Sequence, residues 1–328
     1  MFNKSLLSIA AAAALGMGVT SANAVVFSYD GSGSAGSQVN LIGLDWSPDN
    51  ALSIGALSTP PVNGSQTLQT VAQGKLATFT TASGPQSALF AQTGREYTFQ
   101  ASFFETATGI GTSAAAFQLA SGANYFKVYA DTANNSNQVT GTGYGDGTLI
   151  LSGTINSLTG TFNDFTRLLP SLYPVTGLDQ FANGPGGNGD VDGGVVSHVG
   201  NGSNTVNVKI DFLDPSYFLG NVAELILTLN YNDTTNLAVP FNAAQPSDSV
   251  VGFTPNYSYV NGAKVNGADC TQGGVTESGT RTRSCDFQFQ SDAAGSFVNQ
   301  VPEPASLALV GLALAAAGVA SQRKKKSA

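Results

Sequence analysis

The sequence is poor in the side chains that most enzymes place in their active sites. Its 328 residues include one histidine, two cysteines and one tryptophan. A Ser-His-Asp triad would need His198 as its base, but His198 stands in a short valine-rich run that is typical of a strand. A surface or hydrogen-bonded histidine is the better explanation of that position. Nucleophilic catalysis is therefore poorly supported.

Glutamate is scarce as well. Four glutamates lie between the two ends of the chain: Glu96, Glu105, Glu224 and Glu277. Glu96 and Glu105 flank an expected strand, and nine residues of extended chain would hold them roughly 30 Å apart. Such a separation is too large for the paired carboxylates of a glycoside hydrolase. A secreted hydrolase acting on polysaccharide remains the alternative function, disfavoured by this composition.

Basic residues are few outside the chain ends. Residues 25–301 hold eight of the 13 Lys and Arg residues but 20 of the 21 acids, which gives this part a net charge of −12. Nucleic-acid binding is disfavoured, since phosphate contacts need a basic patch. Solubility outside the cell and attraction for divalent cations are the expected consequences.

Short alternating runs replace amphipathic helical patterns. Apolar residues occupy every second position in runs near 97–103, 126–130, 206–212 and 225–231, and glycine-rich turns separate the runs. This period of two marks half-buried antiparallel strands. We expect an all-β fold, an antiparallel β-sandwich of jelly-roll type over residues 25–300. If there were two domains, the glycine-rich loop at residues 183–194 would be the boundary.

The same loop holds a candidate metal site. Asn188, Asp190 and Asp192 place oxygen ligands at alternate positions before Gly193, like the opening of an EF-hand calcium loop. Position 12 of such a loop would be Val199, where the motif needs a bidentate glutamate. A solvated flexible loop is the favoured interpretation, so no cofactor is expected, and calcium at this loop is the alternative.

Aromatic residues on strands offer a second kind of site. Aromatic faces stack on pyranose rings, although a tyrosine in a sheet is more often part of its packing. Trp46 is expected to anchor the core. The candidates for a sugar-binding platform are Tyr125, Tyr129, Tyr144, Tyr217, Tyr257 and Tyr259.

The N-terminus has the features of a secretory signal peptide. Lys4 precedes an apolar run, and Ala22-Asn23-Ala24 provides a small-residue cleavage site, so residues 1–24 are expected to be removed. In an exported chain, Cys270 and Cys285 are expected to form a disulfide worth about 3 kcal/mol. A redox or metal-binding role for the two cysteines is the weaker alternative.

The C-terminal segment, residues 301–328, combines three features. Pro302-Glu303-Pro304 forms a stiff non-helical spacer, and an uncharged run from Ala305 to Ala320 follows it. A helix from Ala305 to Ser321 would be about 25 Å long, slightly short for a bilayer core. We expect it to be a single transmembrane helix, which spans with its flanking residues snorkelling or with the bilayer thinned. An apolar helix packed on a core is the alternative, but this run has no polar stripe. The basic cluster that ends it should stay in the cytoplasm; it consists of Arg323, Lys324, Lys325 and Lys326.

This order of motif, helix and basic end resembles the PEP-CTERM sorting signal of Gram-negative bacteria. The resemblance implies processing by an exosortase near Pro302-Glu303-Pro304. It also implies anchoring or release at the cell surface or in the extracellular matrix, in bacteria that secrete exopolysaccharide. The acidic body rich in Thr, Asn and Gly is similar to PEP-CTERM proteins associated with flocculation. We therefore expect a non-enzymatic surface protein that supports floc or biofilm formation, with exosortase and extracellular polysaccharide as partners.

Overall fold

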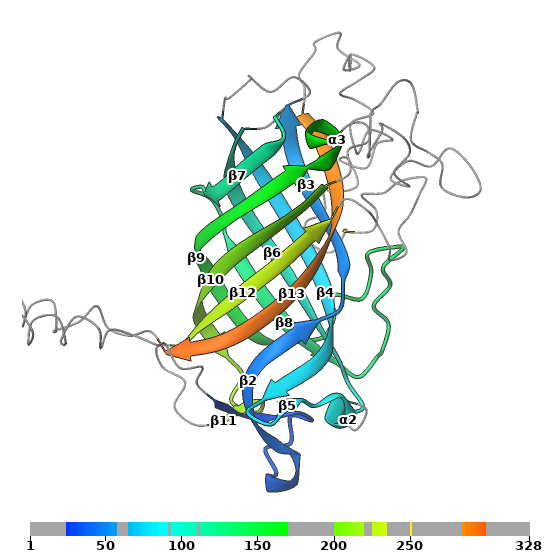
Figure 1. Ribbon diagram of the computed structural model, residues 1–328. Coiled ribbons are helices and arrows are strands. Elements are labelled where there is room, and N and C mark those ends of the chain that lie inside the picture. The colour runs from blue at the N-terminus through cyan, green and yellow to red at the C-terminus, as the bar shows by residue number, and fades with distance from the viewer. Residues whose placement is uncertain are drawn as a thin grey trace, which may run out of the picture. The chain divides into compact units, whose positions relative to one another are not determined.

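Antiparallel strands make up most of the chain that the structure describes (Figure 1). The computed structural model describes residues 24–57, 65–90, 93–109, 112–169, 200–219, 225–234, 250 and 284–299. The first strands and a 3-10 turn are β1 (Val25–Ser28), η1 (Ala35–Ser37), β2 (Gln38–Trp46), β3 (Asp49–Leu57), β4 (Ser65–Thr81) and β5 (Gly84–Pro85). The middle elements are α2 (Ser87–Phe90), β6 (Glu96–Thr108), β7 (Ala114–Leu119), β8 (Tyr125–Asp131), β9 (Thr148–Asp164) and α3 (Phe165–Leu168). The last strands are β10 (Gly200–Leu213), β11 (Phe218–Leu219), β12 (Leu225–Thr234) and β13 (Ser284–Asn299).

These strands form one sheet that closes on itself. Its pairings run from β4 through β6, β8, β9, β10, β12, β13 and β3, and β3 pairs again with β4. Two places in the ring are each filled by two shorter strands in succession. β8 and then β7 lie between β6 and β9, whereas β2 and β3 lie between β4 and β13. Closure leaves these long strands without a free edge.

The hydrophobic core fills the inside of this closed sheet. The ring of Phe99 on β6 lies 4.9 Å from Trp46 on β2, 5.3 Å from Phe126 on β8 and 6.4 Å from Tyr231 on β12, measured between ring centroids. Because β6 and β12 are not neighbours in the sheet, the contact between Phe99 and Tyr231 crosses the interior. Trp46 is 1% exposed, which confirms its predicted role as a core anchor. The outward side chains of the same strands are therefore not part of this core.

A second aromatic cluster closes one end of the interior. Phe27 on β1 packs against Phe79, Tyr97 and Phe218, with ring centroids 5.0 to 6.0 Å apart. The hydroxyl of Tyr97 donates a hydrogen bond to the backbone carbonyl of Tyr29. Tilted and edge-to-face rings of this kind pack densely while their polar atoms find partners.

The predicted antiparallel β architecture is confirmed, but the sheet arrangement differs from a two-sheet jelly roll. Sandwiches and closed sheets bury the same alternate residues, so the periodicity that predicts strands does not distinguish the two. The last described strand, β13, runs from Ser284 to Asn299 and so reaches almost to the C-terminal segment. Among the described residues, no helix has the length and apolar character needed to span a bilayer. The predicted helix at 305–321 lies outside those residues.

Candidate functional site

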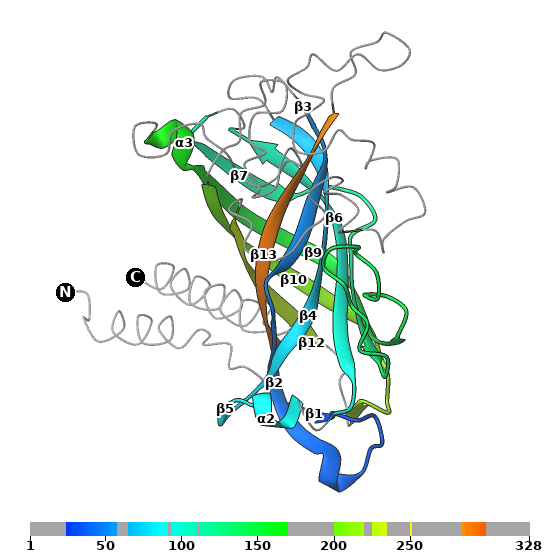
Figure 2. The ribbon, with the colours of Figure 1, turned by 90° about the vertical axis from the view of Figure 1, so that its right-hand side faces the viewer.

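The connection between β8 and β9, residues 132–147, lies over the outward side of β4 and β6, and we name it the strap. Figure 2 shows it as a green trace beside β6. The backbone carbonyl of Tyr144 accepts a hydrogen bond from Thr98 on β6. Gly143 has φ of +79°, and a Cβ atom there would lie 2.5 Å from the carbonyl oxygen of Asn135. The strap therefore folds tightly onto outward polar residues that would otherwise face water.

A buried carboxylate anchors the first half of the strap. Glu96 Oε1 accepts hydrogen bonds from the backbone N–H groups of Asn135 and Ser136, at 3.1 and 2.9 Å. Its Oε2 atom accepts from the Ser136 hydroxyl and lies 2.6 Å from Lys75 Nζ. Lys75 also donates to the side chain of Asn134. Because the Glu96 side chain is fully buried, these donors replace the water that the charge has lost.

A second buried carboxylate anchors the other half. Tyr144 donates a 2.5 Å hydrogen bond to Asp49 Oδ2, and the backbone N–H of Asn50 donates to Oδ1 of the same residue. Burial raises the pKa of Asp49 to about 6, although the hydrogen bond from Tyr144 acts in the opposite direction. Residues 95 positions apart are thus joined by one hydrogen bond beneath the strap.

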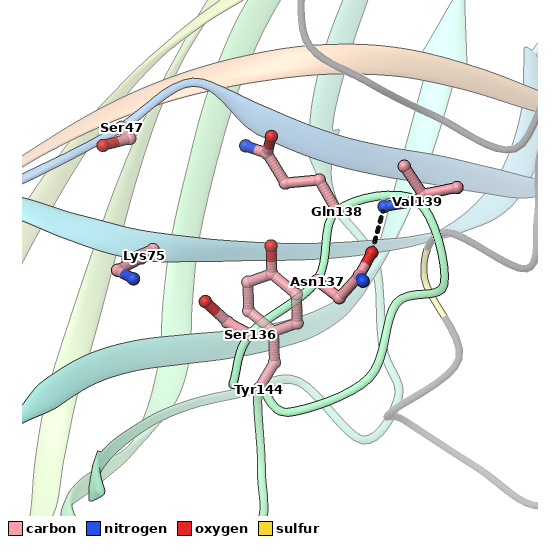
Figure 3. Close-up of a pocket in the computed structure, with 7 residues that line it drawn as sticks. All are labelled: Ser47, Lys75, Ser136, Asn137, Gln138, Val139 and Tyr144. Carbon is pink, nitrogen blue, oxygen red and sulfur yellow. Dashed lines mark hydrogen bonds between the residues drawn. The ribbon is translucent and has the colours of Figure 1, made fainter. Parts of the chain in front are cut away.

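A pocket of about 400 Å³ opens at the margin of the strap. Figure 3 shows its lining, in which Asn137 accepts a hydrogen bond from the backbone N–H of Val139. Most of its polar side chains are already engaged, since Gln138 donates to the carbonyl of Pro48 and Tyr144 to Asp49. The lining residues are Ser47, Lys75, Ser136, Asn137, Gln138, Val139 and Tyr144. The pocket therefore results mainly from the way in which these hydrogen bonds hold the strap against the sheet.

The interior holds a second pair of buried acids. Glu105 on β6 accepts a 2.5 Å hydrogen bond from Thr70, and Asp233 on β12 accepts one of 2.7 Å from Ser291 and another from Asn204. Burial, with a smaller contribution from the charge of Asp233, raises the pKa of Glu105 to about 7, although the hydrogen bond from Thr70 acts in the opposite direction. Burial likewise raises the pKa of Asp233 to about 6, against the effect of its two hydrogen bonds. The two carboxyl groups therefore disfavour simultaneous ionisation.

Tyrosines on β8 form an outward aromatic surface. The inward residues Phe126, Val128 and Ala130 are buried, whereas Tyr125 and Tyr129 on the opposite side stay partly exposed. Lys127 lies between them, and its ammonium group is 4.8 Å from the centroid of the Tyr125 ring. This contact is a cation–π interaction, which leaves the ammonium hydrogens able to bond elsewhere.

The surface continues across β9 onto β10. Tyr125 is paired with Thr154 on β9, and Thr154 is paired in turn with Lys209 on β10. A bulge in β10 exposes Phe212, which is 41% accessible. We call Tyr125, Lys127, Tyr129, Lys209 and Phe212 the β8–β10 face. It combines aromatic rings with cationic groups on the outward side of β8 and β10.

Of the predicted platform tyrosines, the structure separates two groups. Tyr144 and Tyr217 are buried, at 1% and 5% exposure, so they cannot serve as stacking surfaces. Tyr125 and Tyr129 are positioned as that prediction requires. Tyr257 and Tyr259 lie outside the described residues.

Several predicted sites fall on the undescribed part of the chain. His198, Cys270 and the calcium candidates Asn188, Asp190 and Asp192 are among them, and Cys285 is described only as part of the backbone of β13. The disulfide and the calcium site stay predictions. Within the described ranges, no three His, Cys, Asp or Glu residues are grouped so as to hold a metal ion.

The pair Glu105–Asp233 and the strap anchors were not predicted. A signal for the pair exists, because Glu105 continues the inward stripe of Phe99 and Phe103, and Asp233 continues that of Leu229 and Tyr231. A carboxylate in phase with an apolar stripe predicts a buried acid. The expected separation of Glu96 from Glu105 fits the structure, in which they lie at either end of β6 and on opposite faces.

The comparisons with known proteins bear on the C-terminal end. A family model of the PEP-CTERM protein-sorting motif matches residues 300–324. The chain therefore carries a PEP-CTERM protein-sorting motif at its C-terminal end. The motif identifies it as an exported protein that an exosortase sorts, as its Pro-Glu-Pro sequence predicted. No curated protein matches the PEP-CTERM chain. No solved structure matches it either.

Proposed function

We propose that the exported body of this PEP-CTERM protein is a non-enzymatic cell-surface or matrix protein that associates with extracellular polysaccharide. In this role it supports the cohesion of biofilms or flocs, as flocculation-associated PEP-CTERM proteins do. The precursor enters the export pathway through its signal peptide and is held in the inner membrane by the C-terminal helix. Its basic end stays in the cytoplasm until the exosortase acts.

The observation that carries the polysaccharide association is the β8–β10 face. Tyr125 and Tyr129 lie four residues apart on one side of a rigid strand, which places them roughly 14 Å apart along a polymer. Sugar rings present apolar C–H faces that stack on aromatic side chains, and their hydroxyl groups accept bonds from Lys127. An elongated, shallow surface suits a long polymer better than a closed pocket does.

A hydrolase is the alternative, and Glu105 with Asp233 is the feature that favours it. One carboxyl group with a raised pKa beside a second acid is the arrangement that glycosidases use. Both groups are inside the closed sheet, at 4% and 7% exposure, and each is hydrogen-bonded to neighbouring hydroxyl groups. A catalytic pair would need to be reached by a sugar chain. The burial therefore favours a structural role.

A deletion strain tests the proposed function. We expect the strain to lose floc or biofilm cohesion and to regain it when the wild-type chain is supplied. Cohesion that is unchanged by deletion would contradict the role. Cleavage of polysaccharide by the purified protein, abolished in Glu105→Gln and Asp233→Asn, would establish the alternative instead.

Intact mass measurement tests the sorting steps separately. We expect the secreted protein to begin near Val25 and to end near Pro302, and a Glu303→Ala variant to accumulate unprocessed in the membrane fraction. A secreted product that keeps residues 305–328 would contradict exosortase processing.

A further inference from the structure

We propose that the β8–β10 face binds acidic polysaccharide, with Lys127 and Lys209 contacting the carboxylate groups of uronic acid residues. This inference rests on the proposed association with polysaccharide and specifies its chemical class. It starts from the positions of the cationic side chains, which are rare in this chain.

The two lysines of the face lack acidic partners within the described part of the chain. Lys75 is paired with Glu96, and Arg95 donates to the backbone carbonyl of Asp30. No described carboxylate lies within 4 Å of the ammonium group of Lys127 or Lys209. In a body that holds 20 acids and only eight bases, two lysines without a described ion pair are the places where an external anion can bind.

The acids nearest to these lysines in sequence are engaged by other groups. Asp211 accepts a 2.6 Å hydrogen bond from Thr154, and Asp131 accepts one from the backbone N–H of Ala133 at the start of the strap. Both carboxylates are thereby held in place by local donors. Neither carboxylate forms an ion pair with Lys127 or Lys209, so both ammonium groups keep donors for an external anion.

The arrangement of the face fits a chain of charged sugars. Lys127 and Lys209 lie on β8 and β10 with β9 between them, which places them roughly 10 Å apart across the sheet. Tyr125 contacts Lys127 directly. It is also in the same cross-strand row as Lys209, because Thr154 on β9 pairs with both residues. Tyr129 and Phe212 supply further aromatic surface. A polyuronate matches both features of the face. Its apolar ring faces can stack on the aromatic side chains, and its carboxylates can contact the lysines.

The acidic surface elsewhere limits binding to this place. A polyanion is repelled by a body of net charge −12, so direct contacts with the two ammonium groups are needed to offset that repulsion. Binding should therefore be sensitive to salt. At about 1 M ionic strength the Debye length falls to about 3 Å, which screens exposed lysines almost completely.

Native gel electrophoresis of the exported protein tests the inference, with alginate as the acidic polysaccharide and dextran as the uncharged one. We expect alginate to retard the wild-type protein and dextran to have a much smaller effect. Lys127→Gln and Lys209→Gln should each weaken alginate binding by roughly threefold or more, and the double variant by about tenfold. Thr159→Ala, an exposed substitution further along β9, is the matched control and should bind as the wild type does.

Far-UV circular dichroism checks that each variant is folded. We expect all of them to fold, because the substituted side chains lie on the outward side of the sheet. The inference is overturned if the lysine variants bind alginate like the wild type, or if dextran retards the protein as strongly as alginate. In the latter case, loss of binding in Tyr125→Ala and Tyr129→Ala would leave polysaccharide association standing and remove only the acidic preference. Binding to neither polymer, together with an unchanged deletion strain, would overturn both proposals.

Discussion

Two outward regions of the sheet, one on β4 and β6 and the other on β8 to β10, use lysine residues in opposite ways. On β4 and β6 the strap covers the surface, and Lys75 is fixed by a buried glutamate. β8 to β10 form the open face, where Lys127 and Lys209 make no ion pair with a described acid. β9, β10 and β12 lie side by side across the front of Figure 1, with no described segment over them.

This difference separates charge that stabilises the fold from charge that is available to a partner. A buried ion pair must be complete, since loss of one member leaves an uncompensated charge in a dry environment. An exposed lysine contributes little to folding, because water solvates it in either state. Substitutions on the two sides should therefore affect different properties of the protein.

The largest effect is expected from Glu96→Gln. This change removes the carboxylate that accepts from the strap backbone and from Lys75, and we expect it to lower the free energy of unfolding by about 3 kcal/mol. Urea denaturation measures this loss. Asp131→Asn, on an outward position of β8, is the control and should change stability far less. Equal losses in the two variants would mean that the strap is not fastened by Glu96.

A smaller effect is expected from Tyr144→Phe. The change keeps the ring but leaves buried Asp49 without its hydroxyl donor, at a cost of about 2 kcal/mol. Tyr129→Phe on the open face is the matched control. A Tyr144→Phe protein as stable as the wild type would show that the hydrogen bond to Asp49 contributes nothing.

The free energy of unfolding should also depend on pH, because several buried acids have raised pKa values. Folding raises the pKa of Glu105 from 4.5 to about 7, so the folded protein holds a proton that the unfolded chain has released. The stabilising contribution is complete below about pH 4.5 and is lost as the pH rises to about 7, with a size on the order of 3 kcal/mol. Asp49 and Asp233, each raised to about 6, act in the same direction over a lower range.

Thermal unfolding of the wild type and Glu105→Gln at several pH values isolates this contribution. We expect the two proteins to differ little near pH 5 and the variant to gain relative stability as the pH rises. A constant difference between them across this range would contradict the raised pKa of Glu105.

The smallest effect on stability is expected on the open face. Lys127→Gln removes a partly exposed charge and a contact with one ring, so the free energy of unfolding should change by less than about 0.5 kcal/mol. Denaturation curves beside those of Glu96→Gln measure the contrast. A large loss in Lys127→Gln would mean that this lysine belongs to the fold rather than to a binding surface.

The sequence predicts which residues of each strand face inward better than it predicts how the strands are assembled. Phe99 and Phe126 follow a period of two, and both are in the core as expected. Closure of the sheet depends on pairings between distant segments, such as β3 with β13, which local periodicity does not contain. The hydrogen bond between Asp49 and Tyr144 escapes prediction for the same reason, because the two residues meet only after the strap has folded.

The central claim is that a partner meets the open face while the strap side maintains the fold. It is tested most directly by measuring alginate binding and melting temperature together for Glu96→Gln and for the double variant Lys127→Gln/Lys209→Gln. We expect Glu96→Gln to melt at a lower temperature yet to bind alginate while it is folded, and the double lysine variant to melt normally but to lose binding. The claim would be contradicted if the double variant bound alginate normally or if folded Glu96→Gln did not bind.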